Sequence, residues 1–261
     1  MWRLVVAWGI LKTLNDNPYS MFKAFRTNTD EISKLENSVK STDIDNLKSL
    51  QKDFKQKIRP FILPKDGVIK GETLKDTYFP TSKDGKPYDI FISHSHNNQK
   101  EAEILAAWLK KYKGLSCFVD SFVWGSADEL LKEIDNKYCK NDRKNTYDYT
   151  KRNFTTSHVH AILSMSLLEI INESSYCIFI ESSESLNLAC LDKKKTFSPW
   201  LYEEIEYMKT LVPKEANLKT FCKAVTESKD LKFEYEISEL DNFSFLKYDD
   251  FLRLRCMTQT L

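Results

Sequence analysis

The chain has 261 residues, of which 41% are hydrophobic and 13% aromatic, so it carries enough apolar material for a folded core and wholesale disorder is excluded. Lysine and arginine number 39 and aspartate and glutamate 38, and this balance gives no general reason to expect nucleic acid or an anionic membrane as a partner. The six cysteines include no CxxC pair, which favours a reducing, cytoplasmic setting without a disulfide framework.

The apolar stretch at residues 4–11 is followed at once by Lys12 and is too short to span a bilayer. No small-residue cleavage site follows it, which argues against a signal peptide. We expect an amphipathic helix that packs on the protein body, with a peripheral membrane anchor as the alternative. Stable membrane insertion is not expected.

Residues 1–63 are predicted to form a helical region. Between Ile32 and Ile58 the apolar residues recur mostly at steps of three or four, the period of a helix, and prolines at 60 and 64 end the pattern. Residues 64–86 hold several prolines and glycines in quick order, which is typical of a linker. The α/β domain is then predicted at 87–261.

From residue 88 the pattern alternates between strands and helices, which predicts an α/β fold whose parallel sheet is flanked by helices on both faces. Residues 139–156 are polar and are interpreted as an inserted loop. The expected strands are 88–93, 115–120, 176–182 and 231–238, and the expected helices are 98–112, 126–138, 157–174, 198–211 and 248–257.

Ligands of open parallel sheets gather at the carboxyl ends of the strands. Here polar residues occupy those ends: Ser93 to His96 after the first strand, Asp120 and Ser121 after the second, and Glu181 to Ser183 after the third. These residues are the first pointer to a site.

The histidines fall into two HxH pairs, His94 with His96 and His158 with His160. Four histidines could hold zinc, but no acidic or cysteine ligand lies at a recognisable spacing, so we expect helix capping and polar lining of a cleft rather than a metal site. The sequence contains no GxxxxGK[ST], GxGxxG or GxSxG motif, which excludes a glycine-rich phosphate loop and a nucleophile elbow.

Trp200 and Glu204 lie four residues apart in a predicted helix that Ser198 and Pro199 begin. Positions i and i+4 share one face of a helix, so an aromatic ring and a carboxylate would project together. Taken alone, the pair is better interpreted as a core tryptophan beside a solvated surface glutamate.

The segment that carries Trp200 and Glu204 is the last of four segments that form a recognisable order. The order of four segments is similar to that of the Toll/interleukin receptor (TIR) domain over roughly residues 86–212, and the part around 118–139 looks closest to bacterial TIR-like proteins such as those of Thoeris antiphage systems. The four segments are KPYDIFISHS, LSCFVDS, LLEIINESSYCIFIESSESL and SPWLYEEI.

This resemblance implies a TIR/flavodoxin-like fold, here with an N-terminal helical appendage, and an NAD+ glycohydrolase or ADP-ribosyl cyclase. NAD+ would be the substrate, no cofactor would be needed, and the ADP-ribose-derived product would signal to a separate effector in antiphage defence. By resemblance, Glu204 is the catalytic carboxylate, Trp200 shapes the nicotinamide-ribose pocket, and Ser93 and His94 line the same cleft. Asp120 ends the second strand beside it.

The sequence departs from the family at the first strand tip, where His94 and Ser95 stand in place of an aromatic residue and an arginine. The positive charge that binds the phosphate groups of the substrate would then have to come from His94 or His96, or from Arg143 or Arg152. Trp124 could stack on a base or simply pack.

Two alternatives stay open. The first is a non-catalytic TIR adaptor that works through homotypic contacts, with Glu204 as a surface charge; self-association is also expected of a catalytic member. The second is a nucleoside or nucleotide ribosyl-transfer enzyme on a related sheet.

Overall fold

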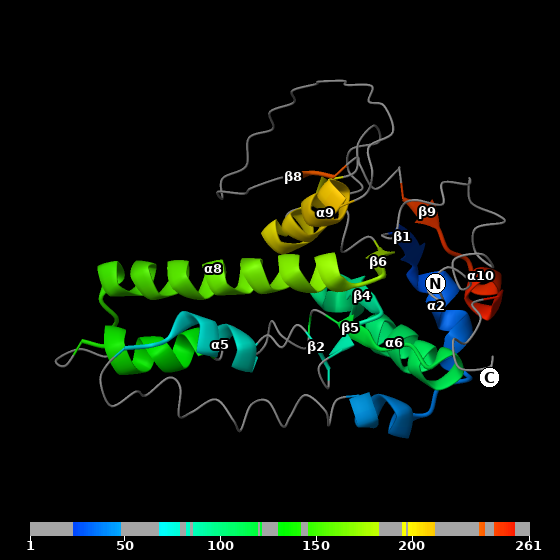
Figure 1. Ribbon diagram of the computed structural model, residues 1–261, viewed down its shortest axis with the longest axis horizontal. Helices are drawn as coiled ribbons and strands as arrows, with labels where there is room; N and C mark the ends of the chain where they lie inside the picture. Colours follow the sequence, from blue (N-terminus) through cyan, green and yellow to red (C-terminus); the bar gives the residue numbers. More distant parts are fainter. Residues whose placement is uncertain are drawn as a thin grey trace.

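A parallel sheet of five strands forms the centre of the chain (Figure 1). From one edge to the other its strands are β5 (Cys117–Val119), β4 (Ile90–Ser93), β6 (Tyr176–Glu181), β1 (Lys23–Asn28) and β9 (Ser244–Phe245). Every neighbouring pair runs parallel, so the predicted α/β fold with a parallel sheet is confirmed. The computed structural model describes residues 23–47, 68–78, 82–83, 86–119, 121, 130–141, 146–182, 195–196, 198–211, 235–237 and 243–253.

The sheet is buried on both faces, as the short apolar runs of its strands predict. Phe91 and Phe179 lie in one hydrophobic cluster, on a side that we call face one. Ile92 and Ile178 lie in a second cluster, on face two. Side chains alternate between the faces of a strand, so Ser93, two residues after Phe91, belongs to face one.

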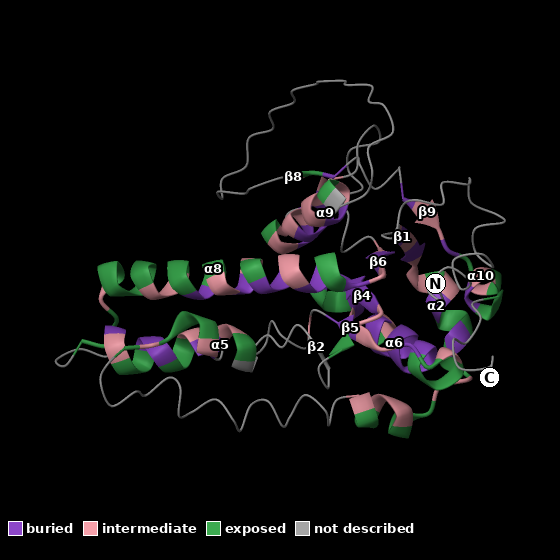
Figure 2. Cartoon of the chain, in the orientation of Figure 1, coloured by how far each residue is buried: buried purple, intermediate pink, exposed green. Residues whose placement is uncertain are grey.

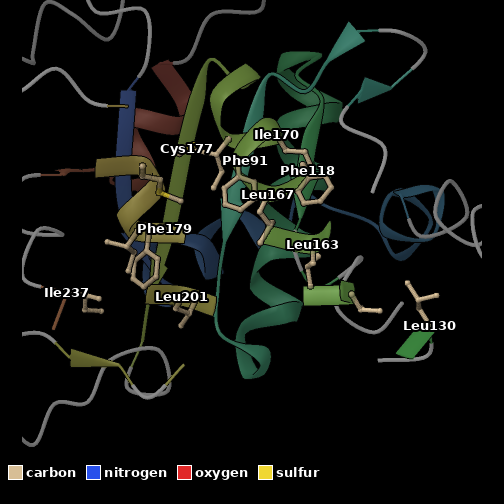
Figure 3. Packing of buried hydrophobic residues seen from close by; sticks show 14 of the residues in the cluster. Phe91, Phe118, Leu130, Leu163, Leu167, Ile170, Cys177, Phe179, Leu201 and Ile237 are labelled. Atoms are coloured by element: carbon tan, nitrogen blue, oxygen red, sulfur yellow. The ribbon is translucent and has the colours of Figure 1, made fainter. Parts of the chain in front are cut away.

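Helices cover each face, and their inner sides are the buried ones (Figure 2). The described helices on face one are α5 (Gly71–Tyr78), α8 (Tyr149–Glu173) and α9 (Pro199–Leu211). Those on face two are α2 (Thr29–Glu36), α6 (Gln99–Lys113) and α10 (Tyr248–Arg253). Figure 3 shows the face-one core, where Leu163, Leu167 and Ile170 of α8 pack against the rings of Phe91 and Phe118.

Short elements complete the described chain. A 3-10 turn, η1 (His96–Asn98), leads into α6, and a π-helical turn, η2 (Asp135–Cys139), follows helical residues 130–134. Residues 41–47 are helical as well. Two small antiparallel ladders join β2 (Ser82–Lys83) to β3 (Lys86–Pro87) and β7 (Lys195–Thr196) to β8 (Tyr235–Glu236).

The prediction of an N-terminal helical appendage at residues 1–63 is wrong at residues 23–28, because these form β1 inside the sheet, between β6 and β9. The helical pattern holds from Thr29 onward, where α2 begins with Asn28 as its N-cap. Residues 1–22, including the apolar stretch at 4–11, lie outside the described residues. The domain boundary expected at 87 therefore falls within a single sheet and its cores.

Three further expectations need correction. The linker at 64–86 contains α5, whose Leu74 is buried in the face-one core and whose Lys75 binds Glu169 of α8 at 2.8 Å. The loop expected at 139–156 is shorter, because α8 begins at Tyr149, eight residues before the helix start predicted at 157. Asp148 caps the helix by accepting a hydrogen bond from the Lys151 amide. Of the strand expected at 231–238 the structure describes residues 235–237, where β8 pairs with β7 and not with the parallel sheet.

The strand order differs in one place from the 2-1-3-4-5 order of flavodoxin-like sheets. Counted from β4, the neighbours β5, β4 and β6 reproduce the first three positions. The place beside β6 is then taken by β1, from the N-terminal part of the chain, and not by a later strand. Polar contacts help to hold β1 in the sheet. Arg26 donates hydrogen bonds to Glu181 on β6 at 2.9 Å and to the Phe243 carbonyl oxygen at 3.1 Å.

Helix α8 reaches well beyond the sheet (Figure 1). Its 25 residues span about 37 Å, whereas the six residues of β6 span about 20 Å. Because α8 leads almost directly into β6, it runs antiparallel to the strands and its first part overhangs their carboxyl ends. Among the described residues α8 is also the one helix long and apolar enough to cross a membrane; a helix that packs in a protein core passes the same test, so this property carries little weight.

Candidate functional site

The candidate site lies where the helices that follow two neighbouring strands diverge. β4 is followed by α6 on face two, whereas β6 leads on to α9 on face one. The two strands are direct neighbours, with Ser93 of β4 opposite Phe179 of β6. A divergence of this kind opens a crevice at the carboxyl ends of the strands, the usual ligand position in open α/β sheets. The polar ends of β4 and β6 therefore lie side by side, at the expected edge of the sheet.

Ser93 and Glu204 meet at the carboxyl end of β4. The Ser93 hydroxyl donates a hydrogen bond to Oε2 of Glu204 at 2.6 Å, and both residues are 0% exposed. Hydrogen bonds to a charged acceptor contribute roughly 1.5–3 kcal/mol. A carboxylate that has been taken fully out of water is thus held by a specific donor from the sheet, 111 residues away in the chain.

Helix α9 places Glu204 there by its periodicity. Leu201, Glu204, Ile205 and Met208 are all buried, and they follow the i, i+3, i+4, i+7 pattern of one helix face. The helix starts at Pro199, after Ser198, whose hydroxyl accepts from the Leu201 amide at 3.3 Å. The carboxylate therefore occupies a position on the core side of α9, which a leucine would occupy in an ordinary amphipathic helix.

The side chain of Glu204 lies over the face-one side of β6. Burial, and next the nearby Glu204 carboxylate, raise the pKa of the Cys177 thiol well above its ordinary range. Cys177 is therefore a thiol and not a thiolate at neutral pH, which removes it as a nucleophile for this site. Glu204 is the fully buried acidic side chain that the described structure places beside Ser93.

His94 follows Ser93 at the tip of β4 and is 3% exposed. Its Nδ1 is 2.7 Å from the Ser95 carbonyl oxygen, and because a carbonyl only accepts, Nδ1 carries the proton. This bond fixes the orientation of the ring at the tip of β4. His96, two residues on, is exposed in η1.

Sequence reasoning missed a second polar contact at the same edge. The hydroxyls of Ser95 and Ser182 both donate to Oδ1 of Asn98. Asn98, buried at the start of α6, thereby ties the tip of β4 to the end of β6. Its position between a strand tip and a helix start was a visible signal, but its partner in β6 is 84 residues away.

Trp200 lies one turn before Glu204 and is partly buried against the face-one core. Its indole packs edge to face against His160 of α8, with ring centroids 5.0 Å apart. The two HxH pairs therefore do not meet as a cage: His158 packs instead against Phe154 on its own helix, at 4.4 Å. The sequence analysis expected cleft lining or helix capping of the histidines, but it did not predict the contact of His160 with Trp200.

Several expected residues do not add to the described site. Asp120, Trp124 and Arg143 lie outside the described residues. Arg152 is engaged on the overhanging part of α8, where its Nε binds Asp135 at 2.8 Å. Within the described ranges, no group of three or more histidine, cysteine or acidic side chains could hold a metal ion.

The arrangement is suited to stabilising positive charge. It offers one buried carboxylate that accepts from Ser93. The imidazole of His94 and the Ser95–Asn98 contact lie at the same edge of the sheet, and the Trp200 indole lies one helical turn before Glu204. Comparison with protein-family models, with curated proteins and with solved structures finds no match for this chain.

Proposed function

We propose that this chain is a TIR-like enzyme that cleaves the nicotinamide-ribose bond of NAD+, as a glycohydrolase or ADP-ribosyl cyclase, with Glu204 as the catalytic carboxylate. The observation that carries the proposal is the 2.6 Å hydrogen bond from Ser93 to Glu204 at the carboxyl end of β4. It joins the strand tip and the helix carboxylate, two residues 111 positions apart that the sequence resemblance assigns to one cleft.

The chemistry needs what this site supplies. The nicotinamide ring of NAD+ is cationic and leaves as a neutral molecule, so no strong general acid is required. Departure leaves an oxocarbenium-like ribose, the same kind of transition state as in glycoside hydrolysis. A preorganised carboxylate beside the anomeric carbon stabilises that charge and can hold the ribose hydroxyls. NAD+ is consumed as a substrate, which explains why no dinucleotide-binding glycine motif is needed.

Each neighbour has a role in this proposal. Ser93 fixes one oxygen of Glu204 and with it the direction of the carboxylate. Trp200 forms a wall for the nicotinamide-ribose unit, and His94 lines the strand tip. Asp120 and Trp124 are proposed to contact the substrate from the segment after β5.

The burial of Glu204 adds a requirement. Because its side chain has no exposure in the substrate-free chain, NAD+ reaches it only if a conformational step opens the crevice. Such steps commonly gate closed active sites. They also give a natural point for control by a trigger or by self-association.

We place the product, linear, cyclic or conjugated ADP-ribose, as a cytoplasmic signal to a separate effector in bacterial antiphage defence. The main alternative is a TIR adaptor without catalysis, in which Glu204 is a surface charge. The complete burial of Glu204 weighs against that form of the alternative and supports the enzyme.

The decisive assay follows free nicotinamide released from NAD+ by purified protein. Glu204→Gln should lower the rate by about a hundredfold or more, the usual cost of losing a group that stabilises transition-state charge. Glu206→Gln is the matched control, because Glu206 lies on the same helix but pairs with Lys209 at 3.4 Å; it should keep the wild-type rate.

The assay is run at low and high protein concentration and with lysate from infected cells, so that assembly or a trigger can act. A Glu204→Gln variant as active as wild type would refute the proposal. Competition by free nucleosides would instead favour the ribosyl-transfer alternative.

A further inference from the structure

Two aromatic rings join the overhanging helix α8 to the start of α9. His160 lies near the middle of α8 and is exposed, and its ring meets the indole of Trp200 at 5.0 Å and 70°. This is edge-to-face geometry, within the favourable range of separations for aromatic pairs. The contact reaches the helix turn directly before Glu204.

The indole is held from two sides. On its inner side Trp200 packs against the face-one core, and on the α8 side it meets His160. The same first turns of α9 are held again at Tyr202, whose ring stacks on Tyr235 of β8 with centroids 4.7 Å apart. A partly exposed side chain that loses one of its two supports regains rotamer freedom.

We propose that His160 is a positioning residue of the NAD+ site: it fixes the indole of Trp200 in the orientation in which that indole receives the nicotinamide-ribose unit. This inference rests on the proposed function. His160 acts through Trp200 and takes no part in bond breaking. Its effect is therefore on how well substrate is held, more than on the chemical step.

His158 provides the matched control within the same helix. It lies two residues before His160, is also exposed, and also makes an edge-to-face ring contact, with Phe154 at 4.4 Å. Two residues along a helix turn a side chain to a different face, and the contact of His158 stays within α8. Any general effect of losing a histidine from this helix should appear in both variants.

The first experiment measures NAD+ cleavage in four proteins. His160→Ala should raise KM about threefold to tenfold, the range set by the strength of an aromatic pair, with kcat within about twofold. His160→Phe keeps a ring at the contact and should restore most of the affinity. His158→Ala should behave as wild type.

The second experiment separates the contact from turnover. In the Glu204→Gln background, NAD+ affinity is measured by calorimetry with and without His160→Ala, and a loss of about threefold to tenfold is expected. Tryptophan emission is recorded for wild type and His160→Ala, and again with Trp200→Phe in both. The difference that His160→Ala causes should vanish once Trp200 is replaced.

The outcomes are distinct. If wild type cleaves NAD+ and Glu204→Gln does not, but His160→Ala keeps the wild-type KM, the role of His160 is refuted and the proposed function stands. Equal effects of His160→Ala and His158→Ala would refute it as well. If wild type neither binds nor cleaves NAD+ under any of the activating conditions, the proposed function fails and the role of His160 fails with it.

Discussion

Replacing Ser93 by alanine tests the central contact of the site. The substitution removes one hydroxyl group from a fully buried position and leaves Oε2 of Glu204 without its 2.6 Å donor. A hydrogen bond to a charged group contributes about 1.5–3 kcal/mol. With about 2–4 °C of melting temperature per kcal/mol in a chain of this size, Ser93→Ala should lower Tm by roughly 3–12 °C.

A double-mutant cycle identifies the source of that loss. Glu204→Gln still offers an amide oxygen to Ser93, so in this background Ser93→Ala should cost only about 0.5–1.5 kcal/mol, the value of a neutral hydrogen bond. Unfolding is followed by near-ultraviolet circular dichroism in urea. Ser33→Ala is the control, because its hydroxyl bonds within an exposed turn of α2, and it should stay within about 0.5 kcal/mol of wild type.

The reasoning would be refuted in either of two ways. One is a Ser93→Ala protein that melts within about 1 °C of wild type. The other is an equal cost of Ser93→Ala in the wild-type and Glu204→Gln backgrounds, which would show that the carboxylate charge plays no part. In both cases the fixed orientation of Glu204, on which its catalytic role depends, would have no support.

Two more tests address other ionisable groups. Cys177 should resist a thiol reagent in the folded chain and react on unfolding, because burial first and Glu204 second raise its thiol pKa; fast labelling of native protein would contradict this. The Lys34 ammonium, and then the Tyr248 amide at 2.7 Å, lower the pKa of Glu31 from its ordinary value of 4.5. Glu31 therefore stabilises the fold above that value and loses this effect as the pH falls through its lowered pKa. Glu31→Gln should lower the free energy of unfolding by about 1–2 kcal/mol at pH 7 and by little in strong acid. Urea titrations of both proteins at the two pH values measure this, and an equal difference at both would contradict the proposed link to the ionisation of Glu31.

The sequence predicted the elements whose signal is local. Short apolar runs identified β4 and β6, and the three-to-four spacing of apolar residues identified α2, α6 and α9 close to their observed bounds. These patterns require only that one face or both faces of an element be buried. They do not depend on which partner covers it.

The interior strand β1 was not predicted, because the signal for it is not local. Among its described side chains only Phe25 and Thr27 are buried, and Arg26 interrupts the apolar run. The arginine is accommodated by tertiary contacts, with Glu181 at 2.9 Å and over the Phe245 ring at 5.6 Å. Its partners lie more than a hundred residues away, beyond what a periodicity analysis can include.

The same distinction between local and long-range signals applies to the residues of the candidate site. Ser93 was predicted from its place at a strand end, and the side of α9 that carries Glu204 follows from helix spacing. Asn98 and His160 came into view only in the folded chain, because their importance lies in contacts with Ser182 and Trp200 from other elements. The resemblance named the reactive group, whereas the residues that hold it in place depend on the fold.

The position of β1 also bears on how rigid the site is. The end of β6 is tied to β4 on one side, where Ser182 donates to Asn98. On the other side, Glu181 accepts from Arg26 of β1. The strand beneath Glu204 is thus anchored across both of its neighbours at its carboxyl end. A carboxylate stabilises a developing charge best when its surroundings need not reorganise during the reaction, so a strand inserted from the N-terminal part of the chain would contribute to catalysis without reaching the substrate.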